Sequence, residues 1–216
     1  QNQKEINDWI AAGNGIYQAD VKPGDVKYVD VNHDGVINAS DKVDLGNGLP
    51  KYTFGFNFNL AWKGFDLSAN FTGAAGFQIA QSYRDPSSSQ ANYSRRILKR
   101  WTGEGTSNEI PRVTYGDVGN WLFSDLYLQD GDYIRLQNLT MGYDFKKLIS
   151  WKGLSKMRLY FQVQNLFTLT KYDGMDPEIG SFNGTDGNSS DSWVSGVDMG
   201  YYPHPRTFIV GLNLAF

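Results

Sequence analysis

The last ten residues of the chain, 207–216, alternate between large apolar and small or polar side chains. A period of two is typical of a β-strand whose faces meet different surroundings, so we predict a strand near 206–216. Chain ends usually fray unless they are held in place, yet the last residue of this sequence is apolar. A closed barrel in a lipid bilayer would give such a strand two neighbours and an apolar environment, whereas the alternative is the last strand of a soluble sandwich. One face carries Phe208, Val210, Leu212, Leu214 and Phe216, and the other carries Thr207, Gly211, Asn213 and Ala215, with Ile209 as the exception.

The clearest alternation begins at Tyr52 and predicts two strands, 51–62 and 65–75. Lys63 and Gly64 between them have the composition of a tight turn, which predicts a hairpin. The aromatic face suits the lipid side of a barrel and the polar face suits a wet interior. In a soluble sheet the aromatic face would need a second layer to cover it. The apolar face carries Tyr52, Phe54, Phe56, Phe58, Leu60, Trp62, Phe65, Leu67, Ala69 and Phe71, and the polar face carries Thr53, Asn57, Asn59, Asp66, Ser68, Asn70 and Thr72.

Two further alternating segments predict strands near 132–145 and 154–169, which makes five predicted strands in all. The links between the five strands are short and long in turn. Outer-membrane barrels have short periplasmic turns and long extracellular loops. With a periplasmic C-terminus, strand parity places both long links and residues 1–50 outside the cell. The short links are 63–64 and 146–153, and the long links are 76–130 and 171–205.

We therefore predict an all-β fold, a partial antiparallel transmembrane β-barrel with long extracellular loops. Five strands cannot close a membrane barrel, since the smallest have about eight, and open edges would leave backbone groups unpaired in lipid. The chain is thus expected to supply the last five or so strands of a larger barrel and not to fold alone. Residues 1–50 are expected to form an extracellular loop segment, and residues 51–216 the C-terminal strands and their loops. We expect Phe54, Phe56, Phe58, Phe161, Leu212 and Leu214 to face lipid, and Asn57, Asn59, Asn70, Gln162, Gln164 and Asn213 to face the lumen.

Composition excludes several classes of function. The net charge of -3 gives no basic surface of the kind that binds nucleic acid. Cysteine is absent, which removes disulfides, thiol nucleophiles and cysteine zinc sites. Mean hydropathy is -0.46, and no apolar run approaches the ~20 residues of a spanning helix. Because the sequence begins at Gln1 and shows no signal peptide, we expect a processed protein or a piece of a longer one.

No catalytic motif stands out. The two histidines, His33 and His204, are far apart in sequence, and there is no nucleophile elbow, phosphate-binding loop or zinc-protease motif. Asp173 and Asp176 are a carboxylate pair of the kind used in glycoside hydrolysis, but loop carboxylates are usually solvated, so no enzyme activity is predicted. The alternative function is a secreted calcium-dependent β-sandwich that binds glycans. Aromatic residues of the long links could stack on sugar rings, or serve loop packing or partner docking: Tyr83, Tyr93, Trp121, Trp193, Tyr201 and Tyr202.

Residues 30–41 match the spacing of a twelve-residue calcium loop. Oxygen ligands at alternate positions can converge on one hard cation, and a glycine at position six permits the sharp turn. Position twelve is Asp where Glu is usual, so the loop must tighten or the ion must lose a ligand. The alternative is an Asp/Asn-Gly turn held by side-chain hydrogen bonds without metal. The predicted ligands of a structural Ca²⁺ are Asp30, Asn32, Asp34, the backbone carbonyl of Val36 and Asp41, with Gly35 at position six and Asn38 acting through water.

Several stretches, taken in order, resemble the C-terminal region of SusC/RagA-family TonB-dependent transporters. The resemblance covers nearly all of residues 25–216, whereas residues 1–24 carry less of it. The stretches are DVNHDGVINASD (30–41), GNGLPKYTFG (46–55), KGFDL (63–67), RWT (100–102), IPR (110–112), GDYIRLQNLTMGY (131–143), RLYFQVQNLF (158–167), DPE (176–178) and the closing strand.

This resemblance implies a barrel of about 22 strands with an internal plug, in the outer membrane of a Gram-negative bacterium. It implies import of glycans or peptides with a SusD-like surface lipoprotein as partner. Transport would depend on the TonB complex, which in this family is contacted by an N-terminal part that this chain does not contain.

Overall fold

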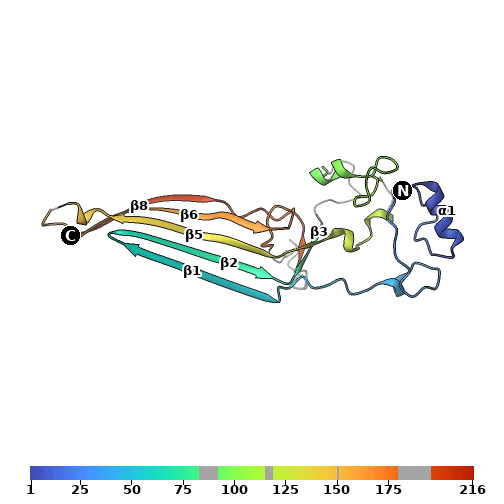
Figure 1. Ribbon diagram of the computed structural model, residues 1–216, viewed down its shortest axis with the longest axis horizontal. Coiled ribbons are helices and arrows are strands. Elements are labelled where there is room, and N and C mark those ends of the chain that lie inside the picture. The colour runs from blue at the N-terminus through green and yellow to red at the C-terminus, as the bar shows by residue number, and fades with distance from the viewer. Residues whose placement is uncertain (83–91, 115–118, 150, 180–195) are drawn as a thin grey trace, which may run out of the picture. The chain divides into compact units, whose positions relative to one another are not determined.

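The computed structural model describes residues 1–82, 92–114, 119–149, 151–179 and 196–216 (Figure 1). Tyr83 and Trp193, two of the loop aromatics named above, lie outside these residues. Two compact units are formed by Gln1–Leu45 with Ser82–Leu128, and by Gly46–Gln81 with Gln129–Phe216. The division at residue 50 stays a prediction. Within the described part of the chain, no helix has the length and apolar character needed to cross a membrane.

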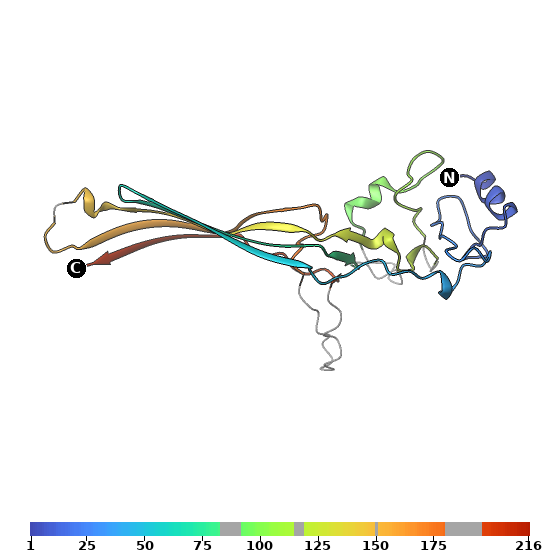
Figure 2. The same ribbon diagram turned by 60° about the horizontal axis from the view of Figure 1, so that its bottom comes forward.

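The second unit is built on one long, twisted, five-stranded sheet (Figures 1 and 2). Its strands follow the order β1-β2-β5-β6-β8, and every neighbouring pair is antiparallel. The five predicted strands are confirmed, each within a few residues of its expected ends. The strands are β1 (Tyr52–Trp62), β2 (Phe65–Ala75), β5 (Tyr133–Asp144), β6 (Lys156–Thr170) and β8 (Thr207–Ala215).

The strand register collects apolar residues on one face of this sheet and polar residues on the other. Directly paired residues share a face, so each row of partners shows the character of that face. One apolar row runs Phe58, Ala69, Leu139, Val163, Phe208 across all five strands. The neighbouring polar row runs Asn57, Asn70, Asn138, Gln164, Thr207. The predicted division of side chains between two faces is therefore confirmed, and which face meets lipid stays a prediction.

No second sheet covers the apolar face within the described residues. Phe56 is 58% exposed, Trp62 is 67% exposed and Leu212 is 51% exposed. A soluble β-sandwich would bury these side chains between two layers. The alternative of a sandwich is thus contradicted by the fold.

A β-bulge in β5 sets which residues face which side near the start of that strand. Asn138 pairs with Asn70, but Leu136 pairs with Phe71, so Gln137 is an extra residue without a partner on β2. An added residue exchanges the faces of everything beyond it. Strict alternation would place Arg135 on the apolar face, and the bulge places it on the polar face instead.

A second, small sheet and a compact core lie at one end of the same unit. The short strand β3 (Gln78–Gln81) lies between β4 (Leu128–Asp130) and β7 (Val197–Asp198), and it runs parallel to β7. These three strands lie in segments that we predicted as long loops. The core consists of Ala74, Phe77, Ile79 and Tyr172, with Tyr133 and Ile179 packed against it.

The first unit has little regular structure and is held by side-chain hydrogen bonds. The carboxylate of Asp25 has no exposed surface and accepts hydrogen bonds from Arg112 at 2.6 and 3.2 Å and from the amide of Asn120 at 2.8 Å. These contacts tie the segment around residue 25 to residues about 90 positions later. The helices of this unit are α1 (Gln3–Ala11) and the short 3₁₀ helices η1 (Ala39–Asp41), η2 (Arg95–Lys99), η3 (Gly119–Trp121) and η4 (Asp125–Tyr127), and a fifth, η5 (Phe145–Lys147), follows β5.

Candidate functional site

The predicted calcium loop closes on itself through its first and last carboxylates. Asp30 is 7% exposed, and its two oxygens accept the N–H groups of Asp34 at 3.3 Å and Gly35 at 2.7 Å. Asp41 accepts the N–H groups of Val31 at 2.9 Å and of Asn38 at 2.7 Å, so its side chain bridges the start and end of the loop. The backbone of Gly35 has φ +81°, the left-handed region that a glycine adopts without strain.

The donor set of this loop partly fits a hard cation. Hydrogen bonding by the N–H of Asn38 and other backbone groups holds the pKa of Asp41 below its usual value, so that carboxylate is charged at neutral pH. Asn32 donates its amide to Asp34 at 2.9 Å, which keeps their oxygens close together. In the described residues, however, no three His, Cys, Asp or Glu side chains are grouped as a metal site would require. The hydrogen bonds present are those of an Asx-type turn.

A second cluster of polar groups lies on the polar face of the large sheet around Arg135. The side chain of Arg135 is 2% exposed and donates to Thr168 of β6 at 2.9 Å. Its guanidinium also pairs with Asp176, and with Glu178 at 2.7 Å. The Asp176 side chain is 6% exposed, whereas that of Glu178 is 47% exposed. The Arg135–Asp176 pair is therefore a buried ion pair, which is destabilising to break.

The same cluster joins both ends of the connection between β6 and β8. Asp176 follows β6, and its other carboxylate oxygen accepts the backbone N–H of His204, just before β8, at 3.0 Å. The ring Nδ1 of His204 lies 3.2 Å from that oxygen. Burial alone would raise the pKa of Asp176, but the N–H groups of His204 and Glu178 and the charge of Arg135 hold its pKa below the usual value. Asp176 thus stays charged and links the two chain segments to the sheet.

A buried carboxylate also anchors the exposed segment that precedes β8. Asp198 is 1% exposed; it accepts the hydroxyl of Tyr172 at 2.6 Å and the N–H groups of Gly200 and Tyr201 at 2.9 and 3.0 Å. Tyr202, four residues after this anchor, is 82% exposed. The segment therefore presents aromatic surface from a fixed base.

Comparison with known proteins identifies what this sheet belongs to. The chain is 34% identical over 206 residues to TonB-dependent receptor P3 of Formosa agariphila, a match that covers 94% of this chain and 20% of the receptor. It is 29% identical over 205 residues to TonB-dependent receptor SusC of Bacteroides thetaiotaomicron, covering 93% and 18% respectively. Solved structures of the RagAB peptide transporter share the fold, one with a TM-score of 0.61 at 25% identity over 79% of this chain and 18% of that chain. No protein-family model matches the chain.

The chain belongs to the SusC/RagA family of TonB-dependent transporters. Its five-stranded sheet is part of the outer-membrane β-barrel of such a transporter, which confirms the predicted fold class and location. The chain spans about a fifth of the length of the curated relatives that it matches.

The contacts described above explain three of the family motifs in structural terms. The GDYIRLQNLTMGY stretch supplies Arg135 and the bulge, and the DPE stretch supplies the two carboxylates that Arg135 binds. The IPR stretch supplies Arg112, which pairs with buried Asp25. Sequence reasoning named these motifs but not the ion pairs within them. The signal available was an arginine at a position where strict alternation requires an apolar residue.

Proposed function

We propose that this chain supplies part of the barrel wall and extracellular surface of an importer for glycans or peptides. The observation that carries the proposal is the continuous apolar face across five antiparallel strands, in a chain 34% identical to a TonB-dependent receptor. The relatives are receptors and transporters, and we assign no catalytic role to the chain. The energy for import would come through the TonB complex.

The partner in this proposal is a SusD-like surface lipoprotein. The relatives include SusC, and a solved structure of the RagAB peptide transporter shares the fold at 25% identity; both support a partner of this kind. A surface partner of this kind is expected to meet a mostly polar contact with scattered aromatic residues. Tyr202, 82% exposed on the connection between β6 and β8, has the properties of such a contact residue.

Import is tested by deleting the gene of the whole transporter and measuring growth on separate glycan and peptide sources. Growth on one source should be lost and should return when the gene is restored. Unchanged growth on every candidate source would count against import.

The partner is tested by copurification from outer membranes with an affinity-tagged transporter. Tyr202→Ala should reduce the amount of lipoprotein recovered. Leu148→Ala is the matched control, because Leu148 is 68% exposed on the short link that we place at the other side of the membrane. Equal recovery with both variants would exclude Tyr202 from the partner contact.

A second part of the proposal is a structural calcium ion in the loop of residues 30–41. Calcium takes six to eight oxygen ligands, and the loop offers four side chains and one backbone carbonyl. The backbone N–H groups that donate to the carboxylates of Asp30 and Asp41 support this assignment, since these hydrogen bonds already bring the loop ends together. A bound ion would fix the loop without taking part in transport chemistry. The residues that would hold it are Asp30, Asn32, Asp34, the carbonyl of Val36 and Asp41.

Calcium is tested by trypsin cleavage of the full-length transporter at Lys27 and Lys42, which flank the loop and are both exposed. Added calcium should slow cleavage at both lysines, and Asp34→Ala should remove this protection. Asp20→Ala is the control, because the side chain of Asp20 is 86% exposed and lies outside the loop. The calcium proposal is wrong if cleavage has the same rate with calcium and with a chelator and no anomalous-scattering peak lies in the loop. The loop would then be the metal-free turn.

A further inference from the structure

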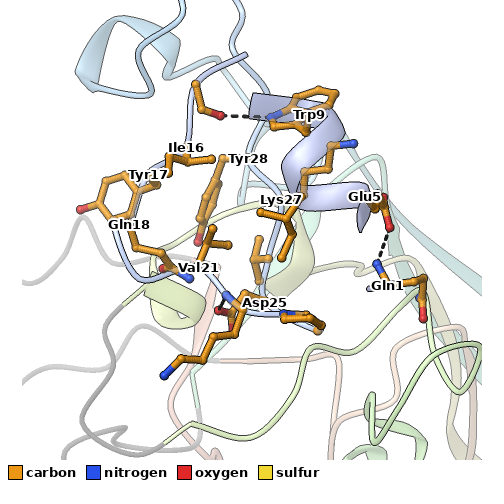
Figure 3. Close-up of a pocket in the computed structure, with 16 residues that line it drawn as sticks. Gln1, Glu5, Trp9, Ile16, Tyr17, Gln18, Val21, Asp25, Lys27 and Tyr28 are labelled. Atoms are coloured by element: carbon orange, nitrogen blue, oxygen red, sulfur yellow. Dashed lines mark hydrogen bonds and ion pairs between the residues drawn. The ribbon is translucent and has the colours of Figure 1, made fainter. Parts of the chain in front are cut away.

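A small pocket in the first unit lacks the room to enclose a whole ligand (Figure 3). Its volume is about 80 Å³, against roughly 300–1,000 Å³ for sites that hold a small molecule. Two polar groups that line it are already paired: the N-terminal ammonium of Gln1 with Glu5, and the indole N–H of Trp9 with the carbonyl of Gly15 at 3.1 Å. Exposed charge on the second unit gives a clearer indication of a partner.

The two ends of the five-stranded sheet differ in charge. The β1–β2 turn and the link that follows β5 lie together at one end, where the N–H of Asp144 donates to the carbonyl of Gly64 at 2.8 Å (Figures 1 and 2). The described side chains at this end include five basic and two acidic residues: Lys63, Lys146, Lys152, Lys156 and Arg158 against Asp66 and Asp144. Those at the opposite end include four basic and six acidic residues: Lys51, Arg135, Lys171 and Arg206 against Asp130, Asp132, Asp173, Asp176, Glu178 and Asp198. The end with the short links is therefore the positive one.

The two carboxylates at the positive end are already engaged. Asp66 binds the guanidinium of Arg158 through both oxygens, at 2.8 and 2.5 Å. Asp144 accepts the backbone N–H groups of Lys146 at 3.0 Å and of Met157 at 3.3 Å. The lysines of the two short links thus keep their charge without a carboxylate from these residues.

Three lysines of the short links can meet an external anion. Lys63 and Lys152 are exposed, and neither has a carboxylate partner among the described residues. The ammonium of Lys146 donates to the carbonyl of Trp151 at 2.7 Å, which leaves two of its three N–H groups for another acceptor. An anion beside the two links would therefore bind ammonium groups without displacing a carboxylate of the protein.

Exposed aromatic side chains extend the apolar face up to these lysines. The ammonium of Lys63 lies 5.0 Å from the centre of the Trp62 ring, and the rings of Trp151 and Phe216 meet edge to face with their centres 6.2 Å apart. All three aromatic residues are exposed. Aromatic residues gather where a barrel wall meets lipid headgroups, and lysine stems lie along apolar surface while the ammonium reaches the polar layer. The partner that fits has an anionic group directly beside hydrocarbon.

We propose that the positive end of the sheet binds the headgroup of an anionic phospholipid, whose phosphate pairs with Lys63, Lys146 and Lys152. The acyl chains of that lipid would lie against the adjacent aromatic and aliphatic side chains. A zwitterionic lipid fits less well, because its own cation competes with the lysines for the phosphate. The inference goes beyond the proposed import function: it rests on the barrel and not on which nutrient is imported.

The test is lysine footprinting of the full-length transporter in lipid nanodiscs. Acetylation by an N-hydroxysuccinimide ester is followed by mass spectrometry, in phosphatidylcholine alone and in an equal mixture with phosphatidylglycerol of the same acyl chains. Phosphatidylglycerol should slow acetylation of Lys63, Lys146 and Lys152 at least about five-fold, the factor expected for one lysine beside an anionic lipid surface. Lys51 is the matched control, because it is exposed next to Tyr52 at the other end of β1 and both leaflets contain the same lipids. Its acetylation rate should stay the same.

Two variants and a soluble headgroup decide between a lipid site and general charge effects. Lys63→Gln combined with Lys152→Gln should abolish the protection of Lys146 by phosphatidylglycerol, whereas Lys51→Gln should preserve it. Glycerophosphoglycerol, which lacks acyl chains, should give no protection in phosphatidylcholine nanodiscs. The proposal is overturned if phosphatidylglycerol protects Lys51 as strongly as Lys63, if the double variant keeps the protection, or if the soluble headgroup protects as well as the lipid. Each of these outcomes is independent of growth in the gene-deletion test of import.

Discussion

Replacing Arg135 with alanine should release the connection between β6 and β8 from the sheet. The substitution leaves the carboxylate of Asp176 buried without its cation, although the N–H groups of Glu178 and His204 still donate to it at 2.9 and 3.0 Å. Removing one partner of a buried ion pair costs about 3–5 kcal/mol. The pair with Glu178 adds little, because that carboxylate is 47% exposed and exposed pairs contribute about 0–1 kcal/mol.

The assay is hydrogen exchange of the full-length transporter, read by mass spectrometry over residues 171–179 and 199–206. A loss of 3–5 kcal/mol corresponds to roughly 100- to 5,000-fold faster exchange where local opening governs it. The exchange rate of Arg135→Lys should lie between those of the parent and of Arg135→Ala, because an ammonium keeps the charge but cannot bind Thr168, Asp176 and Glu178 together.

The control is Lys171→Ala in the same connection. Lys171 is 86% exposed and lies 3.8 Å from Asp130, so its loss should change exchange by no more than a few-fold. The proposed role of Arg135 is refuted if residues 171–179 and 199–206 exchange at the same rate in Arg135→Ala as in Lys171→Ala while the strands stay protected from exchange in both variants.

Three further outcomes follow from the sheet and from Asp176. Phe56→Lys, near the middle of β1, should destabilise the barrel in lipid vesicles by about 2–4 kcal/mol in denaturant titrations, whereas Asn57→Lys on the opposite face should be tolerated. Gly73→Ala should cost about 1–3 kcal/mol in the same titration, because a Cβ there would lie 2.6 Å from the backbone carbonyl oxygen of Tyr133, whereas the matched Gly55→Ala has room. Because the folded pKa of Asp176 lies below 3.8, its stabilising effect is complete above about pH 4 and is lost as the pH falls through the folded pKa. Exchange near Asp176, corrected for intrinsic rates, should therefore be equal at pH 7 and pH 5 and rise below about pH 4, with no such rise in Asp176→Asn.

The long strands could be predicted because a sheet with one apolar and one polar face has apolar side chains at every second position of the sequence. Tyr52 to Trp62 alternates without a break, and the structure has a strand over those residues. The short strand Gln78–Gln81 gives no such signal, since four residues carry too little pattern and its partners come from distant parts of the chain. A local pattern cannot report a pairing that depends on long-range contacts.

The contacts around Arg135 could not be predicted for the same reason. Asp176 lies 41 residues after Arg135, and Thr168 lies 33 residues after it, so spacing along the chain does not reveal that they meet. The bulge at Gln137 left one signal in the sequence, the break in alternation that puts Arg135 where an apolar residue is expected, but that break alone does not show which residues Arg135 contacts. The motif of residues 30–41 was visible because its hydrogen bonds are local, although the sequence cannot distinguish a metal loop from a turn.

The bulge in β5 has a consequence for how the sheet avoids misfolding. An apolar face as uniform as this one distinguishes poorly between strand pairings that differ by two residues, since each keeps apolar side chains on the same side. A pairing without the bulge would instead place Arg135 among the apolar side chains of the other face and would leave Asp176 without its cation. Arg135, which breaks the apolar–polar alternation of β5, thus disfavours strand pairings that the apolar residues alone would allow.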